Sequence, residues 1–298
     1  MAFSAYFKKA ALAVRLFLGR NVTLGDKTYR MKALFINHLA LKDGTKLTEP
    51  WLDAVYQTVL RCREGAFLDI GANIGQTMLK ILSLDPSRQY IGFEPQVACC
   101  FMIQGFLEEN HISNYEILPV GLSNKNGTEK LFLREGNYDP AASMVRNFRP
   151  EGFYTSHHNV CVREGDELIS ELPVSSVSAI KIDAEGAELE VIEGLRKIIR
   201  EKMPFIIFEV LNHFLVITGE KLDDQCIRFR EARIQKMEDI LRQMEYVILN
   251  VRPGNCLKNV RKIVPPVSAD LSVTNYIAVS KLDLDSFLRV FPGSVSDS

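Results

Sequence analysis

The sequence predicts an α/β fold with a mostly parallel sheet and helices on both faces. From residue 66 onward, apolar runs that are typical of buried strands alternate with segments of helical periodicity, and such alternation indicates a parallel sheet. The strand-like runs are 66–70, 89–93, 116–122, 178–182, 204–210, 246–251 and 275–280. The helical segments are near 75–84, 96–110, 186–201 and 224–244.

Composition sets limits on the class of protein. With 298 residues, 47% hydrophobic and 24% charged, the chain is long enough for one large domain with a sizeable core. The formal net charge of -1 gives no reason to expect a nucleic-acid partner. The six cysteines include no Cys-x-x-Cys pair, which favours reduced thiols in a cytoplasmic protein over a zinc site or a redox motif.

Residues 1–60 are interpreted as an N-terminal helical extension or cap, with a helix that starts near Pro50 and runs to Leu60. Residues 1–20 are basic and partly apolar, and they are too charged to span a bilayer. Peripheral contact of this segment with an anionic membrane surface is one interpretation. We favour a terminal helix that packs on its own domain or on a partner subunit of an oligomer.

Residues 61–298 are expected to form the main domain. The alternation breaks near 123–175 into turns and short runs such as 128–133, which we interpret as an inserted hairpin region. The segment from Arg252 to Thr274 contains no helical pattern. The strand at 275–280 is therefore expected to run antiparallel to its neighbour.

A glycine turn follows the first strand, in the run Phe67-Leu-Asp-Ile-Gly-Ala-Asn-Ile-Gly75. Such a turn before a helix lets backbone amides approach a nucleotide-like ligand. Glu94 lies about twenty residues beyond the turn, where a ribose-binding acid is expected. Asn73 replaces the middle glycine of the dinucleotide pattern, so S-adenosylmethionine, which has an ammonium and no phosphate, fits better than NAD. A turn that binds no ligand is the alternative.

A second motif, Ala179-Ile-Lys-Ile-Asp-Ala-Glu-Gly-Ala-Glu188, places two acids at the end of a central strand. Strand ends of this kind border the ligand site in open α/β sheets, so Asp183 and Glu185 are candidate site residues. Helix capping is the alternative role for Asp183. Glu188, in the first helical turn, suits the helix dipole.

Together, the segments Asp69–Gly75, Gly92–Pro95, Lys181–Glu188 and Phe208-Glu209 resemble the FkbM family of S-adenosylmethionine-dependent methyltransferases over approximately residues 65–280. The resemblance implies a class I methyltransferase (Rossmann-like) fold with an antiparallel last strand. It implies S-adenosyl-L-methionine as cosubstrate and O-methylation of a hydroxyl on a sugar, glycan or polyketide-like small molecule. The family often has Ser-Asp where this chain has Ser123-Asn124. The predicted cofactor-binding residues are Asp69, Gly71, Asn73, Gly75, Glu94, Ser123 and Asp183.

Asp183 and Glu185 are also the predicted catalytic residues, because methylation of an alcohol needs a base for the hydroxyl proton. Partial burial is expected to raise the pKa of that base. A divalent metal is an alternative means of activating the hydroxyl, with Asp183, Glu209 and Asn212 as ligands and His213 nearby. We favour a site without a metal.

Two other functions are considered. An NAD-dependent oxidoreductase is disfavoured by the missing third glycine. A non-catalytic scaffold that retains the fold is disfavoured because the glycines and acids of both motifs are intact. The acceptor side is expected from residues 137–160 and from the loops after 183 and 209. Loops of this kind vary, so the sequence does not identify the acceptor.

Overall fold

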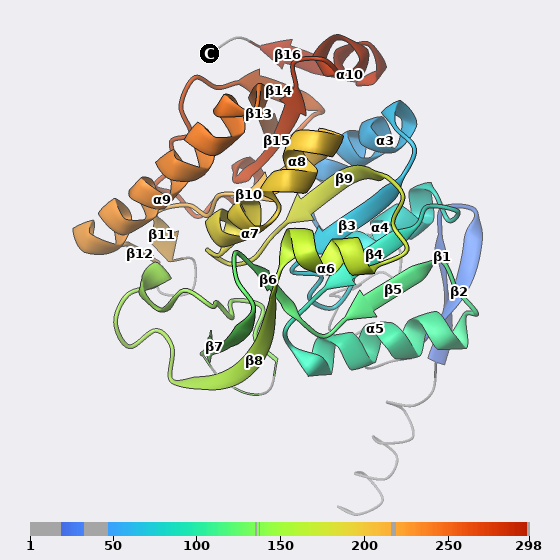
Figure 1. Cartoon of the computed structure of the whole chain (residues 1–298), viewed down its shortest axis with the longest axis horizontal. Helices are drawn as coiled ribbons and strands as arrows, with labels where there is room; N and C mark the ends of the chain where they lie inside the picture. Colours follow the sequence, from blue (N-terminus) through green and yellow to red (C-terminus); the bar gives the residue numbers. More distant parts are fainter. Residues whose placement is uncertain (1–18, 33–46, 135, 137, 216–218, 297–298) are drawn as a thin grey trace, which may run out of the picture.

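The computed structural model of the chain describes residues 19–32, 47–134, 136, 138–215 and 219–296. Within them, a nine-stranded sheet has the order β16-β14-β13-β15-β10-β9-β3-β4-β5 (Figure 1). The neighbours from β10 to β5 pair in parallel, whereas β15 is antiparallel to both β10 and β13. The strands are β3 (Ala66–Ile70), β4 (Tyr90–Phe93), β5 (Tyr115–Leu118), β9 (Val177–Ile182), β10 (Phe205–Glu209), β13 (Tyr246–Arg252), β14 (Cys256–Asn259), β15 (Asn275–Ser280) and β16 (Ser294–Ser296).

The strand order confirms the predicted fold class. Numbered along the chain from β3, the strands from β5 to β13 have the order 3-2-1-4-5-7-6, and the last of them, β15, is reversed as expected. This is the class I methyltransferase arrangement. The order changes direction between β3 and β9, so the carboxyl ends of these two strands mark the switch point where ligands bind in such sheets.

Helices cover both faces of this sheet (Figure 1). One apolar core lies between the sheet and α3, α4, α5 and α10, and a second lies between the sheet and α6, α7, α8 and α9. Every residue of β3, β4, β9 and β15 is buried, which explains their continuous apolar sequences. The helices are α3 (Asp53–Cys62), α4 (Gln76–Leu84), α5 (Val97–Glu109), α6 (Gly165–Glu171), α7 (Glu188–Gly194), α8 (Arg196–Lys202), α9 (Asp224–Gln243) and α10 (Leu284–Val290).

The described part of residues 1–60 differs in part from the expected helical extension. Residues 19–32 form an antiparallel hairpin of β1 (Gly19–Leu24) and β2 (Lys27–Lys32) that packs on α4 and α5. Buried residues alternate along β2, and this period of two favours a strand. The predicted helix is present as α3, preceded by the short 3₁₀ helix η1 (Pro50–Leu52).

Residues 1–18, on which the expected membrane contact mainly falls, lie outside the described residues, as do residues 33–46. The boundary at residue 60 stays a prediction. Among the described residues, no helix is both long and apolar enough to cross a bilayer.

The predicted insert contains a three-stranded sheet of β6 (Gly121–Ser123), β7 (Gly127–Leu133) and β8 (Ser156–Glu164). β7 and β8 form the expected antiparallel pair. The single strand expected at 116–122 is instead divided between β5 of the main sheet and β6 of the insert. Pro119 lies between the two strands, and its missing N–H interrupts the ladder.

The segment 252–274 contains no α-helix, as expected, but it contributes strand β14 and the 3₁₀ helix η3 (Leu271–Val273). The turn between β13 and β14 places Gly254 and Asn255 at φ 76° and 53°, and both residue types tolerate this left-handed region. The Pro-Gly-Asn sequence was therefore a hairpin signal that the strand prediction did not use.

Gly194, at the end of α7, attaches the insert to the main domain. A Cβ atom there would lie 1.9 Å from the carbonyl oxygen of Ser123. We expect Gly194→Ala to lower the free energy of unfolding by roughly 1–3 kcal/mol, because the backbone of β6 must move. In the control Gly105→Ala, the new Cβ would meet only the Lys32 ammonium at 3.7 Å, and we expect a gain of about 0.5–1 kcal/mol in the interior of α5. Urea denaturation measures both, and equal stabilities would contradict the close approach.

Candidate functional site

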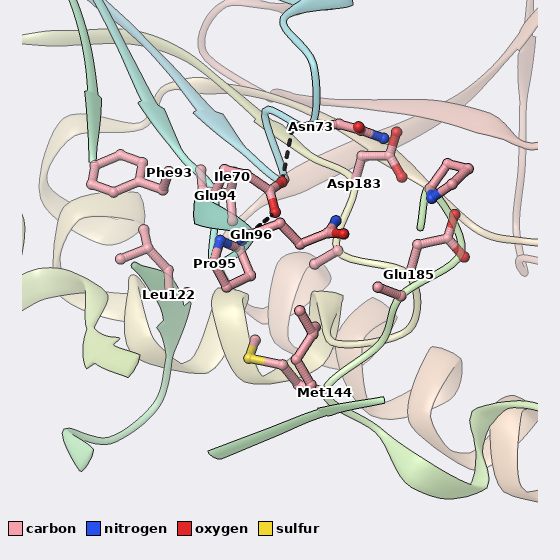
Figure 2. Close-up of a pocket in the computed structure, with 16 residues that line it drawn as sticks. Ile70, Asn73, Phe93, Glu94, Pro95, Gln96, Leu122, Met144, Asp183 and Glu185 are labelled. Carbon is pink, nitrogen blue, oxygen red and sulfur yellow. Dashed lines mark hydrogen bonds between the residues drawn. The ribbon is translucent and has the colours of Figure 1, made fainter. Parts of the chain in front are cut away.

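A cavity lies at the carboxyl ends of β3, β4 and β9, at the predicted switch point. It encloses about 600 Å³ of space that is partly open to solvent. Figure 2 shows Glu94 on one side of this cavity and Asp183 and Glu185 on the other. The insert supplies part of the wall. The lining residues are Ile70, Gly71, Asn73, Phe93, Glu94, Pro95, Gln96, Gly121, Leu122, Leu131, Pro140, Ala142, Met144, Asp183, Ala184 and Glu185.

The glycine turn brings the ends of β3 and β9 together. Gly71 has φ 84°, and a Cβ atom at this position would lie 1.9 Å from the carbonyl oxygen of Asp183. Its N–H donates to the Phe93 carbonyl at 2.9 Å, so the turn is also tied to β4. Only glycine fits here, because a side chain would meet backbone atoms that cannot move aside.

Glu94 is the acid expected to hold a ribose, and the structure places its carboxylate beside the turn. Oε2 accepts a hydrogen bond from the Asn73 N–H, and Oε1 accepts one from the Gln96 N–H, each at 2.8 Å (Figure 2). Burial raises the pKa of Glu94 to about 7, although both hydrogen bonds favour the carboxylate. Each oxygen has a second lone pair with which it can accept a further hydrogen bond.

Asp183 is paired with a buried lysine. Lys181 is only 1% exposed, and its ammonium lies 2.9 Å from Oδ2 of Asp183. Burial alone would lower the pKa of Lys181. The negative charge of Asp183, with smaller contributions from Tyr56, Glu49 and Asp69, instead holds this pKa well above its ordinary value. Lys181 therefore stays charged beneath the cavity.

Glu185 is paired with an arginine of the insert, because Nη2 of Arg149 lies 2.8 Å from its Oε2. Burial raises the pKa of Glu185 to about 7, against the opposing effect of Arg149. The loop itself is held by Glu188, whose Oε1 accepts hydrogen bonds from the N–H groups of Ala184 and Gly186. Glu188 thus fixes the backbone of the acidic loop, which is a more specific role than the expected one with the helix dipole.

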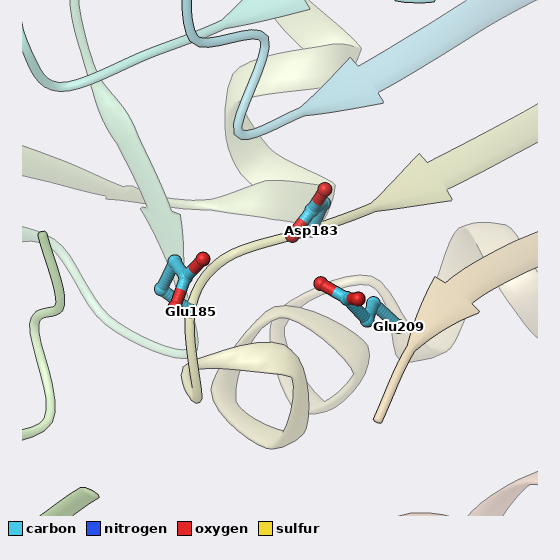
Figure 3. Close-up of side chains that lie close together, drawn as sticks. All are labelled: Asp183, Glu185 and Glu209. Atoms are coloured by element: carbon cyan, nitrogen blue, oxygen red, sulfur yellow. The ribbon is translucent and has the colours of Figure 1, made fainter. Parts of the chain in front are cut away.

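Three carboxylates converge beside the cavity. Oxygen atoms of Asp183, Glu185 and Glu209 lie within 4.8 Å of one another (Figure 3). Burial and the charges of the other two raise the pKa of Glu209 well above its ordinary value. Hard cations such as Mg²⁺ prefer oxygen ligands of this kind, yet Asp183 and Glu185 are each already paired with a cationic side chain.

The metal set considered from the sequence differs from this cluster. The Asn212 amide donates to the Ser268 carbonyl. Burial lowers the pKa of His213, and the charge of Arg230 lowers it as well. Glu185 joins Asp183 and Glu209 in the carboxylate cluster, and the ligand role considered for Asn212 stays a prediction. A site without a metal stays a prediction.

Three predicted cofactor residues do not line the cavity. Asp69 is fully buried beneath it, where its carboxylate accepts a hydrogen bond from the Tyr90 hydroxyl. Gly75, at φ 84°, begins α4 and packs near Ile103. Ser123 is buried, with its backbone against α7. All three support the cavity from behind, whereas Gly71, Asn73, Glu94, Asp183 and Glu185 line it.

Comparison with known proteins identifies the family. The sequence model of the methyltransferase FkbM domain matches residues 69–248, more than half of the chain. The chain belongs to the FkbM methyltransferase family. This assignment confirms the resemblance found in the sequence motifs.

Two curated relatives of this FkbM-family chain are similar at low identity. The AMB antimetabolite synthetase AmbE of Pseudomonas aeruginosa is 25% identical over 271 residues, which cover 78% of this chain and 12% of the synthetase. Methyltransferase 1 of Beauveria bassiana is 24% identical over 161 residues, which cover 49% of this chain and 65% of that protein. The chain thus spans a small part of the first relative and about two thirds of the second.

Solved structures are also similar to the FkbM-family chain. The FkbM methyltransferase of Methylobacillus flagellatus has 15% identity and a TM-score of 0.41, over 72% of this chain and 43% of that one. The O-methyltransferase of Bacillus cereus, solved in complex with SAH, has 12% identity and a TM-score of 0.43, over 82% and 86%.

Two charged residues that act on the site of this FkbM-family chain were not predicted from the sequence. Arg149 had no motif around it, and only its place within 137–160 connected it with the acceptor side. Glu49 precedes η1, has a left-handed φ of 52°, and its Oε1 lies 3.3 Å from Nδ2 of Asn275. The negative charge of Glu49 contributes to the raised pKa values of Lys181 and Glu209. No local sequence signal could place it beside strands that follow it in the chain.

Lys181 supplies positive charge that the FkbM-family site needs at neutral pH. Burial raises the pKa of Asp69 from 3.8 to about 6, and Lys181 is the largest opposing influence. The folded protein thus binds this proton more tightly than the unfolded chain, and stability falls as pH rises from about 4 to 6. In Lys181→Met the pKa of Asp69 rises further. The stability of this variant therefore continues to fall with rising pH beyond the range seen in the wild type.

We therefore expect Lys181→Met to lower the free energy of unfolding by roughly 3 kcal/mol at pH 8, and by less at pH 5. Urea denaturation at both pH values measures the difference. The control Lys236→Met removes an exposed ammonium on α9 that is paired with Glu193, and it should cost little at either pH. A pH-independent loss in Lys181→Met would contradict the electrostatic role.

Proposed function

We propose that this FkbM-family protein is an S-adenosyl-L-methionine-dependent O-methyltransferase that acts on a hydroxyl of a sugar, glycan or polyketide-like small molecule. One observation carries the proposal. A single cavity is lined by the glycine turn, by Glu94 and by the two acids Asp183 and Glu185, with Glu94 across the cavity from the two acids (Figure 2). Such a cavity suits a cationic nucleoside beside a group that can accept a proton.

The cavity wall fits the cosubstrate chemically. Gly71 and Asn73 offer close backbone approach, and both oxygens of Glu94 can accept from ribose hydroxyls. Phe93, Leu122 and Met144 supply apolar wall that suits an adenine ring. The negative charges of the cavity favour the sulfonium and the ammonium. When bound, S-adenosyl-L-methionine supplies a methyl group on sulfur, and the thioether leaves without needing a proton.

The protein must then hold the acceptor oxygen in line and remove its proton as the C–O bond forms. Glu185 suits the role of base, because a pKa of about 7 makes a carboxylate a stronger base of which about half is ionised at neutral pH. Asp183 lies beside it, and its charge helps to raise that pKa. We assign Asp183 to orientation of the acceptor hydroxyl and Glu185 to proton removal.

Titration calorimetry with S-adenosylhomocysteine, with NAD as a parallel ligand, tests the cosubstrate. We expect S-adenosylhomocysteine to bind and NAD not to bind. The affinity for S-adenosylhomocysteine should rise from pH 6 to pH 8 as Glu94 ionises around its pKa of about 7. Glu94→Gln should weaken binding about tenfold or more and remove the pH dependence, because hydrogen bonds to a charged group are lost. The exposed Glu116→Gln serves as the control. Binding of NAD alone would favour an oxidoreductase, and binding of neither ligand would favour a scaffold.

Transfer of labelled methyl to hydroxylated acceptors tests the catalytic assignment. We expect Asp183→Asn and Glu185→Gln each to lower turnover about a hundredfold or more, with binding of S-adenosylhomocysteine mostly preserved. The wild-type rate should rise with pH through about 7 as Glu185 loses its proton, and this rise should be absent in Glu185→Gln.

The control variant is Asp239→Asn, on the exposed side of α9, and it should match the wild type. Each assay is run with and without EDTA, so that a metal requirement would be seen directly. Full turnover in both acid variants would show that the proton is removed elsewhere.

A further inference from the structure

A second cavity lies between the insert and the N-terminal end of α9, two segments that Figure 1 shows next to each other. It encloses about 1790 Å³, including space open to solvent. Its walls carry Lys130, Arg146 and Arg149 together with the aromatic side chains of Phe132, Tyr154 and Phe229. The cofactor cavity does not include any of these residues.

Arg149 forms the boundary between the two cavities. Its guanidinium lines the second cavity and pairs with Glu185, which lines the first. An acceptor that lies in the second cavity and extends toward the methyl donor must therefore pass this ion pair. The position of Arg149 is fixed by its neighbour Phe148, whose ring packs directly on Gly186 of the acidic loop.

Two arginines lie on the insert side of this boundary. The Arg149 side chain is 9% exposed, and its Nε has no hydrogen-bond partner of good geometry among the described residues. Arg230 is 1% exposed and donates to the carbonyls of Phe148 and Asn212. Within the described chain, Arg230 forms no ion pair with a carboxylate. Both guanidiniums pack against the Phe148 ring, with the Cζ atoms of Arg149 and Arg230 at 5.6 Å and 3.9 Å from its centroid.

Of these two guanidiniums, only that of Arg149 forms an ion pair with a carboxylate, Glu185. Burial and the charge of Arg149 together lower the pKa of Arg230 to about 10. The acids of the second cavity do not balance this charge. Glu151 is exposed, and Asp223 is exposed and accepts a hydrogen bond from the Cys226 N–H as the N-cap of α9. The second cavity is thus lined by three cationic side chains, Lys130, Arg146 and Arg149, and by these two exposed acids, so its wall is suited to an anion.

We propose that the second cavity binds the methyl acceptor through an anionic group, a carboxylate or a phosphate, held by Arg149 in the field of Arg230. Guanidinium forks match both oxyanions. The exposed Lys130 and Arg146 would attract the acceptor at the mouth of the cavity. The role as acceptor site rests on the proposed methyltransferase function, whereas anion binding itself does not.

The test uses the full chain saturated with S-adenosylhomocysteine and titrated with inorganic phosphate, glucuronate or methyl glucoside. We expect saturable binding of phosphate or glucuronate and none of the neutral methyl glucoside. The tighter of the two anions identifies the acceptor group as phosphate or carboxylate. Arg149→Gln should weaken anion binding roughly ten- to a hundredfold. Lys125→Gln is the matched control, since this insert ammonium is 62% exposed and lies outside the cavity lining.

Circular dichroism shows whether Arg149→Gln folds. If it does not, Arg146→Gln at the exposed mouth replaces it, with an expected loss of about threefold from one solvated charge. Equal anion affinity in wild type and variant, equal binding of methyl glucoside, or no saturable binding below 10 mM would each overturn the proposal. Failure of S-adenosylhomocysteine to bind would instead overturn the methyltransferase function and leave the anion titration to be judged separately.

Discussion

The site depends on one close approach, between Gly71 and the carbonyl of Asp183. A Cβ at residue 71 would lie 1.9 Å from that oxygen, so the ends of β3 and β9 come this near only because glycine is present. The approach is reinforced by the hydrogen bond from the Asp183 N–H to the Ile70 carbonyl. Two motifs more than a hundred residues apart in sequence therefore face the same cavity, and each is useful only beside the other.

A second constraint follows from gathering acids at one edge of the sheet. Asp183, Glu185 and Glu209 lie within 4.8 Å of one another, with Asp69 buried beneath them. Lys181 and Arg149 offset part of this charge from two directions, one from inside the sheet and one from the insert. Burial raises the pKa values of Asp69, Glu94 and Glu185 to about 6 to 7, nearer to neutrality than those of free side chains. This arrangement suits proton transfer at neutral pH.

Much of the fold could be predicted because buried parallel strands leave continuous apolar runs in the sequence. The reversed strand at 275–280 followed from the absence of a helix before it. Elements whose sequence signal is weak or interrupted were missed: the hairpin at 19–32, the division at Pro119, and the strand β14 near the edge of the main sheet. These depend on pairing and packing partners, which a local pattern does not contain.

The candidate site shows the same division. Gly71, Asn73, Glu94, Asp183 and Glu185 were found because their motifs combine strand ends with special backbone needs. Asp69 belongs to the glycine-turn motif, yet its side chain is buried beneath the cavity and accepts a hydrogen bond from Tyr90. Ser123 is buried with its backbone against α7. Arg149 and Glu49 reach the site through tertiary contacts alone. Spacing along the chain carries no information about such contacts.

The packing of Phe148 on Gly186 has a consequence for how this architecture can diversify. The loop that bears Glu185 rests on an aromatic ring from another segment, and that ring also lies under two guanidiniums. A transplanted insert would therefore have to carry its own aromatic support as well as its binding residues. The glycine turn and Glu94 can stay unchanged as the acceptor changes. The residues that bind the acceptor and those that position Glu185 must instead change together.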